Sequence, residues 1–181
     1  ADLSTAATTF TVAITDIDES DATAPTDSNS ATNTVAENAA VAATVGVTAL
    51  SADADGSTNT ITYSVSDQSC TSLFGVDSST GVVSVAATTN LDYETATSCT
   101  VEITATSADL STAATTFTVA VTDVNDESPS DMALSAASAA ENAAAGTDIG
   151  TLSTTDGDAS GNSHVYTLVT DSGGATAYSG T

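Results

Sequence analysis

The chain has 181 residues, of which 24 are acidic, one is histidine and none is lysine or arginine, so its formal net charge is −24. Nucleic acids and anionic membranes are bound mainly through Lys and Arg side chains, so this composition makes both poor partners. Apart from His164 and the amino terminus the sequence offers no cationic group, so ions from solvent must neutralise its carboxylates.

A folded chain is predicted, because 40% of the residues are hydrophobic and Val, Ile, Leu and Phe fall in alternating runs. With few aromatic residues, the core is expected to consist mainly of Val, Ile, Leu and Ala. The sequence contains no run of 18 apolar residues, so no membrane-inserted segment is expected. Its many Ser and Thr residues permit O-glycosylation.

The segment ADLSTAATTFTVA, residues 1–13, recurs letter for letter at residues 108–120, an offset of 107 residues. Each copy continues into an acidic segment, at residues 15–20 and 122–128. A repeat of this length matches one β-sandwich domain and is typical of tandem arrays. We therefore predict the C-terminal end of one repeat at 1–20, a complete repeat at 21–127, and the N-terminal part of a following repeat at 128–181.

Strand patterns dominate the chain. Apolar and polar residues alternate at 9–15, 61–65, 99–105, 117–121 and 165–169, and residues 73–85 read as two strands whose connecting turn ends at Gly81. The Ala-rich segment 133–145 is ambiguous, and we expect strand and loop there because the corresponding residues 35–47 are richer in β-branched side chains. The predicted fold class is all-β, with tandem sandwiches.

Cys70 and Cys99 are the only cysteines, and Cys99 lies on the apolar side of a predicted strand. A disulfide between them is favoured over two reduced core thiols, because the rest of the chain has an extracellular character. Closing a loop of about 30 residues would contribute roughly 3 kcal/mol of stability. A zinc site would need more ligands than two cysteines and one histidine supply.

Carboxylates cluster in short motifs. These are Ala36-Glu37-Asn38, Asp53-Ala54-Asp55, Leu91-Asp92-Tyr93-Glu94 and the acidic segment 122–128, and Glu141-Asn142 and Asp156-Gly157-Asp158 repeat the earlier ones. Together with Phe74-Gly75-Val76-Asp77-Ser78-Ser79-Thr80-Gly81, and in this order and spacing, they resemble the cadherin repeat. The resemblance implies a seven-stranded Greek-key sandwich of immunoglobulin-like architecture, with termini at opposite ends, rod-like stacking of repeats, and Ca²⁺ at each junction.

Calcium prefers six to eight oxygen ligands, largely from carboxylates and carbonyls. At a first junction, between the first and second predicted repeats, the implied ligands are Asp16, Asp18, Asp53, Asp55 and Asn59. At a second junction, they are Glu37, Asp92, Glu94, Asp123, Asn125 and Asp126, together with Asp156, Asp158 and Asn162 from the following repeat.

Two departures from the family pattern concern the first junction. The family usually has an Asp on the strand near Ala105, and this chain has Ser107 instead, so an ion is expected to be weakened or lost there. The acidic segment of the first copy is also one residue shorter than that of the second.

Enzyme activity is not expected. The sequence lacks a nucleophile elbow, a Walker motif and a metal-binding histidine pair, and its paired carboxylates coincide with the implied calcium positions. His164 is more simply a surface or junction residue than a catalytic one. Residues 156–161 match the first half of an EF-hand loop, but the twelfth position is Thr167 rather than Glu, which excludes that motif.

The sequence therefore predicts an extracellular or cell-surface structural and adhesive protein, a calcium-stiffened rod or fibre that associates with itself. The alternative is a glycan- or protein-recognition module of a cell-surface adhesin, working through exposed sandwich loops. Near-identical repeats favour the first function, whereas one divergent repeat with an aromatic-bearing loop would favour the second.

Overall fold

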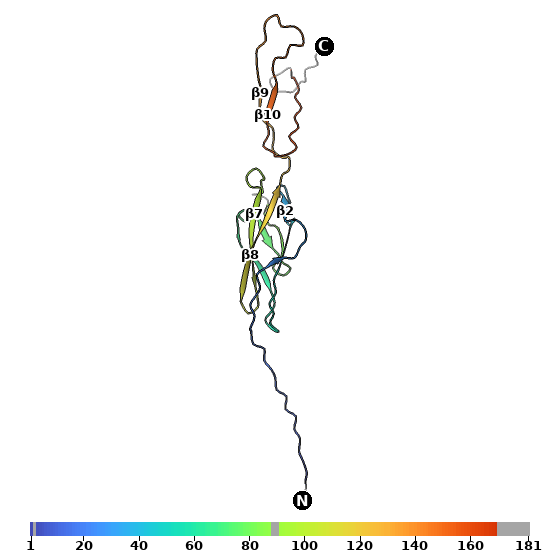
Figure 1. The fold of residues 1–181 in the computed structure, drawn as a ribbon, viewed down its shortest axis with the longest axis vertical. Helices are drawn as coiled ribbons and strands as arrows, with labels where there is room; N and C mark the ends of the chain where they lie inside the picture. The colour runs from blue at the N-terminus through green and yellow to red at the C-terminus, as the bar shows by residue number, and fades with distance from the viewer. Residues whose placement is uncertain (2, 88–90, 170–181) are drawn as a thin grey trace.

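The computed structural model describes residues 1, 3–87 and 91–169, which form an elongated all-β molecule (Figure 1). A central sandwich occupies the middle of the chain. The N-terminal segment extends away from one end of it, and a small two-stranded sheet lies beyond the other end. No helix long and apolar enough to span a membrane occurs among the described residues.

Two four-stranded sheets face each other in the central sandwich. One sheet has the order β1 (Thr26–Asp27), β3 (Thr44–Leu50), β6 (Val82–Val85) and β5 (Phe74–Val76). The other has the order β2 (Thr34–Ala36), β8 (Thr112–Thr122), β7 (Ser98–Thr106) and β4 (Thr62–Gln68). Eight strands therefore stand where seven were expected, because the short β1 and β2 pair with different sheets. All pairs are antiparallel except β2 with β8, which is parallel.

The core lies between the sheets and follows the alternation of the sequence. On β7, Cys99, Val101, Ile103 and Ala105 are buried, whereas Glu102 and the intervening threonines face outward. Residues of β7 and β8 pair continuously from Ser98–Ala120 to Thr106–Thr112. The strands predicted at 61–65, 73–85, 99–105 and 117–121 are confirmed, with small shifts at their ends.

The predicted disulfide is confirmed: Cys70 and Cys99 are bonded. Cys70 lies in the loop between β4 and β5, and Cys99 is on β7. The bond therefore ties the edge of the sandwich to a central strand of the second sheet.

The strand predicted at residues 9–15 is wrong. Those residues form no strand, and Phe10, Val12 and Ile14 are 84%, 83% and 95% exposed. The same sequence forms β8 at its second occurrence, because β2 and β7 supply hydrogen-bond partners there. Alternation fits a strand only where a neighbouring strand pairs with it.

The C-terminal part also departs from expectation. β9 (Ser130–Leu134) and β10 (Leu152–Thr155) form an antiparallel pair, whereas the strand predicted at 165–169 is absent, with one bridge residue at Val169. Of the ambiguous segment 133–145, only the first two residues belong to a strand, and the rest is loop and turn.

The turn between β5 and β6 depends on Gly81, whose φ is 72°. A Cβ at this position would lie 2.1 Å from the carbonyl oxygen of Ala49. We predict that Gly81→Ala lowers the free energy of unfolding by about 2–4 kcal/mol, because it combines a left-handed backbone with a backbone clash. Gly75→Ala, whose Cβ would meet only Ala86 at 3.5 Å, is the control and should have a much smaller effect in denaturant melts.

Candidate metal centre

The second junction is organised around Glu37, whose side chain is 5% exposed. Its Oε1 accepts a hydrogen bond from the amide of Val124 at 2.5 Å, and its Oε2 accepts one from the amide of Tyr93 at 2.7 Å. Glu37 thereby holds together the loop after β2, the loop before β7 and the segment that leaves β8. Carboxylate oxygens of Glu37, Glu94 and Asp123 lie within 4.8 Å of one another.

Asp158, which lies just after β10, contributes to the same junction from the C-terminal part of the chain. It is 3% exposed, and its Oδ1 accepts hydrogen bonds from the amides of Asp126 (3.1 Å) and Glu127 (3.3 Å). Its Oδ2 is buried and has no hydrogen-bond partner, which is costly for a carboxylate unless a ligand binds it. Asp123, just after β8, in turn accepts hydrogen bonds from the loop after β10, namely from the amide of Ala159 and the hydroxyl of Ser160.

Ionisation of this cluster is opposed by its own members. Desolvation raises the pKa of Glu94, and the charges of Glu37 and Asp123 raise it further. Desolvation and the charges of Glu37 and Asp158 likewise raise the pKa of Asp126. A divalent cation among these oxygens would reverse both effects, because it favours the charged form of every carboxylate around it.

The first junction repeats these contacts. Asp55 is 6% exposed and accepts hydrogen bonds from the amides of Glu19 (3.0 Å) and Ser20 (3.1 Å), as Asp158 does at the second junction. Asp16 accepts a hydrogen bond from the hydroxyl of Ser57 at 2.7 Å, the counterpart of the Asp123–Ser160 contact.

The side-chain amide nitrogens of the three predicted asparagine ligands donate hydrogen bonds to backbone carbonyls of the junction loops. The side-chain amide of Asn59 donates to the carbonyl oxygen of Asp55, and that of Asn162 donates to the carbonyl oxygen of Asp158. The amide of Asn125 donates to the carbonyl oxygen of Ser160 at 3.5 Å.

The shorter first linker preserves the spacing of the junction. The amides that bind Asp55 belong to Glu19 and Ser20, three and four residues after Asp16. The amides that bind Asp158 are likewise three and four residues after Asp123. The difference of one residue in the length of the acidic segments therefore lies C-terminal to these hydrogen bonds. The hydrogen-bonding geometry of the two junctions is the same.

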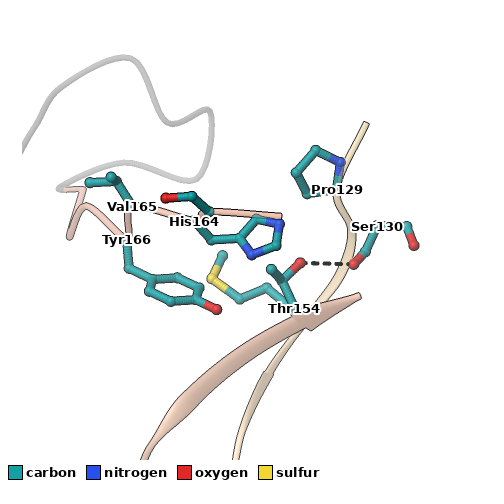
Figure 2. Close-up of a pocket in the computed structure, with 8 residues that line it drawn as sticks. Pro129, Ser130, Thr154, His164, Val165 and Tyr166 are labelled. Carbon is teal, nitrogen blue, oxygen red and sulfur yellow. Dashed lines mark hydrogen bonds between the residues drawn. The ribbon is translucent and has the colours of Figure 1, made fainter. Parts of the chain in front are cut away.

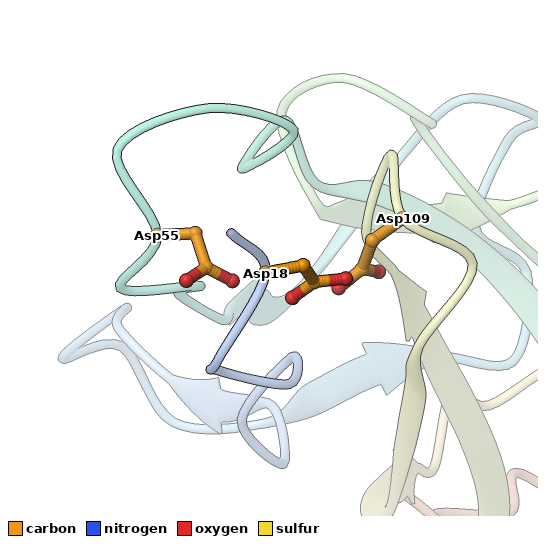
Figure 3. A group of neighbouring side chains, drawn as sticks. All are labelled: Asp18, Asp55 and Asp109. Atoms are coloured by element: carbon orange, nitrogen blue, oxygen red, sulfur yellow. The ribbon is translucent and has the colours of Figure 1, made fainter. Parts of the chain in front are cut away.

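The sequence analysis did not identify Asp109, whose carboxylate belongs to the cluster at the first junction. Asp18, Asp55 and Asp109 bring carboxylate oxygens within 4.8 Å of one another, with Asp18 between the other two (Figure 3). Asp109 lies in the turn between β7 and β8, and its Oδ2 is buried without a hydrogen-bond partner. A hydrogen bond with Asp55, then desolvation and the charge of Asp109, raise the pKa of Asp18 to about 6.

Ser107 occupies the place where the family resemblance implied an Asp. It is 2% exposed, and its hydroxyl donates to Asp53 and to the carbonyl oxygen of Thr58. Ser107 thus anchors a neighbouring carboxylate and contributes no charge, while Asp109 supplies one two residues later. No sequence signal pointed to Asp109, because it follows the strand in a turn where Asp is common.

Two predicted ligands make other contacts. Asp92 binds the amide and the hydroxyl of Thr95, and these bonds lower its pKa. Asp156 lies 2.9 Å from Nε2 of His164, whose hydrogen bond lowers the pKa of Asp156. Within the described ranges, this is the one contact between a carboxylate and a histidine ring at hydrogen-bonding distance.

A hollow of about 350 Å³ beside the second junction is the other candidate site. His164, Val165 and Tyr166 lie on one side of it and Pro129 and Ser130 on the other, with Thr154 between them (Figure 2). Thr154 donates its hydroxyl to the carbonyl oxygen of Ser130 at 2.9 Å. The His164 ring that lines the hollow is hydrogen-bonded to Asp156, so His164 belongs to the second junction as well.

Comparison with known proteins agrees with this architecture. A cadherin-domain profile matches residues 31–122, whereas no curated protein sequence matches the chain. The protocadherin gamma-B4 extracellular domain is 26% identical, with a TM-score of 0.63 over 81% of this chain and 23% of that one. Repeats EC22–24 of mouse cadherin-23 are 26% identical, with a TM-score of 0.56 over 80% of this chain and 46% of theirs.

The chain spans less than half the length of these structures. The matched profile nevertheless covers half of its residues, and the matched residues include the whole sandwich from β2 to β8. The chain belongs to the cadherin family.

Proposed function

We propose that this chain is part of an extracellular structural and adhesive protein, in which Ca²⁺ bound at the two junctions stiffens a rod of cadherin-like repeats. The observation that carries the proposal is the convergence of carboxylates at both ends of the sandwich. At each end, three carboxylates share a space of 4.8 Å, and neither group contains a cationic side chain. Such a cluster repels itself unless a cation binds.

The equivalence of the two junctions supports a tandem arrangement with boundaries near residues 20 and 127. Asp55 and Asp158 bind successive amides of the preceding linker in the same way, and Asp16 and Asp123 bind a serine of the following loop. Because each contact joins one side of a junction to the other, a cation held between them resists bending. Calcium fits this donor set of carboxylate oxygens better than a transition metal does.

The proposed adhesive partner is a second copy of the same protein, as the resemblance to cadherin repeats implies. The aromatic-bearing hollow at His164 and Tyr166 supports the recognition-module alternative less strongly. It lies against the junction and lacks a buried charged group free to bind a ligand, since His164 and Asp156 are bonded to each other.

Calcium should raise the melting temperature, and a chelator should reverse the effect. At a calcium concentration a hundred times the dissociation constant, the expected stabilisation is about 2.7 kcal/mol for each occupied site. Asp158→Asn should remove the second junction's share of the increase, because it deletes the charge of the buried oxygen that has no partner. Asp148→Asn, which changes the same charge at an exposed site, is the control. A melting curve that ignores both calcium and chelator would contradict the proposal.

Asp109→Asn should weaken calcium binding at the first junction by roughly tenfold, about 1.4 kcal/mol, and leave the second junction unchanged. The substitution retains an oxygen to accept the Ser111 amide, so the turn should persist. Calorimetric titration of the variant, with Asp148→Asn alongside, measures the change. Equal isotherms for the variant and the parent would exclude Asp109 as a ligand.

Lowering the pH should stabilise the calcium-free protein but weaken calcium binding at the first junction. The pKa of Asp18 is about 6 in the fold and 3.8 ordinarily, so the folded state binds the extra proton. Without calcium, the free energy of unfolding should therefore fall as the pH rises from about 4 to about 6. Calcium affinity should rise over the same range, because the ion displaces the proton. Titrations at several pH values test this, and Asp18→Asn should remove the part of the dependence that comes from the first junction.

A further inference from the structure

Strand β8 has an edge without a neighbouring strand over residues 112–118. On one side it pairs with β7 along its length, whereas on the other side β2 pairs only with residues 120–122. The amide of Ala120 points to the β2 side, where it donates to the carbonyl oxygen of Asn33, and that of Val121 points to the β7 side. Backbone groups of successive residues in a strand point to alternate sides. The residues whose backbone groups face the open edge are therefore Thr112, Ala114, Thr116 and Thr118.

Nothing in the described part of the chain is hydrogen-bonded to this edge. The backbone N–H and C=O groups of these four residues have no partner there, and their side chains are exposed. The segment that precedes β2 bonds elsewhere, because the amide of Thr23 donates to Ala52 and β1 pairs with β3 in the other sheet. An open row of backbone groups is a template for pairing with another strand.

The other edges of the sandwich are protected against such pairing. Strands β1 and β5 have only two and three residues, and the side chain of Gln68 bonds both the amide and the carbonyl oxygen of Phe74 on β5. Strand β4 carries Asp67 and a shift of register. Short strands, bulges and charges are the usual means of preventing edge pairing. Residues 112–118 contain no charge, no proline and no bulge.

We propose that a second copy of the chain binds at this edge, through antiparallel pairing of β8 with β8 of that copy. The inference rests on the proposed function, and it locates the adhesive contact. A two-fold axis at Thr115 sets Thr112 opposite Thr118 of the other copy and Ala114 opposite Thr116. Every residue that faces the edge then both donates and accepts a hydrogen bond. Two identical antiparallel strands are self-complementary, as a two-fold contact requires.

Charge restricts where two copies can meet. The chain carries a net charge of −24, and carboxylates cluster at both ends of the sandwich. The edge between them is uncharged. The carboxylate beside it on the same sheet is Glu102, which lies on β7 opposite Thr116 and accepts a hydrogen bond from Ser66. A partner of the same charge can therefore approach along this edge with less repulsion than at either end.

The same register makes the contact depend on calcium. The turn that holds Asp109 precedes β8, so it lies near residue 121 of the other copy and close to Asp123 there. The first junction of one copy thus faces the second junction of the other, and the two clusters repel unless cations bind. Because β8 runs roughly along the length of the molecule (Figure 1), the paired molecules lie side by side in opposite directions. Molecules that extend from two facing surfaces meet in this arrangement.

A single cysteine at the two-fold axis tests the register. Thr115 faces its own counterpart at a Cα–Cα distance of about 4.5 Å, which suits a disulfide. Mild oxidation of native Thr115→Cys protein in calcium should give a disulfide-linked dimer, measured by its mass without reductant. Thr112→Cys is the control and should give none, because the two copies of residue 112 are about 20 Å apart in this register.

Substitutions at Thr116 test the edge itself. Thr116→Pro deletes an amide that faces the edge and none that bonds β7, so the melting curve should change little. Thr116→Asp places like charges beside the two-fold axis. In sedimentation equilibrium with saturating calcium, each should raise the dissociation constant of the dimer roughly tenfold or more. Thr104→Asp, on the outward face of the central strand β7, is the control and should retain the dimer.

Three results would overturn the proposal. The first is a dimer that Thr116→Pro and Thr116→Asp leave unchanged, and the second is equal cross-linking through residues 112 and 115. The third is loss of the dimer in Thr104→Asp as well, which would mean that the sheets stack face to face. A chain that stays monomeric in calcium, while calcium still raises its melting temperature, would overturn this inference alone. The proposed function would then stand without it.

Discussion

The structure depends on one electrostatic constraint: carboxylates converge at both ends of the sandwich in a chain without lysine or arginine. Backbone amides replace the missing cations in part. Glu37, Asp55 and Asp158 each accept two amide hydrogen bonds, and these bonds fix where the loops lie. The amides do not neutralise the charge, and they leave other oxygens facing one another. The fold therefore presents a rigid arrangement of negative oxygens whose remaining repulsion an ion from solvent can remove.

The alternation of the sequence predicted most of the sandwich. Strands β7 and β8 were found from residues such as Val101, Ile103 and Val119, because a sheet buried on one face imposes a period of two. The same reasoning failed at Phe10 and Val165, which lie in equally regular patterns but are exposed. A strand is a property of two segments, and a pattern in one of them does not report whether the partner is present.

The junction residues were predicted less completely than the strands. Motif positions identified Glu37, Asp55 and Asp158, and each of these is a buried carboxylate that accepts two backbone amide hydrogen bonds. Asp109 could not be found in this way. It reaches the cluster through the path of the turn after β7, and Ser107, two residues earlier, is the position where a charge was expected. Side chains positioned by turns depend on backbone geometry that neither spacing nor composition encodes.

The parallel pairing of β2 with β8 determines how the sandwich would carry load. These strands belong to opposite ends of the sandwich sequence, so a pull along the molecule shears their hydrogen bonds together and does not open them one at a time. If the sandwich unfolded under force, the Cys70–Cys99 disulfide would keep the residues between the two cysteines from being stretched. With a sequence separation of 29, that loop withholds about 100 Å of chain from the unfolded sandwich. The disulfide is thus a limit on how far the molecule lengthens under force.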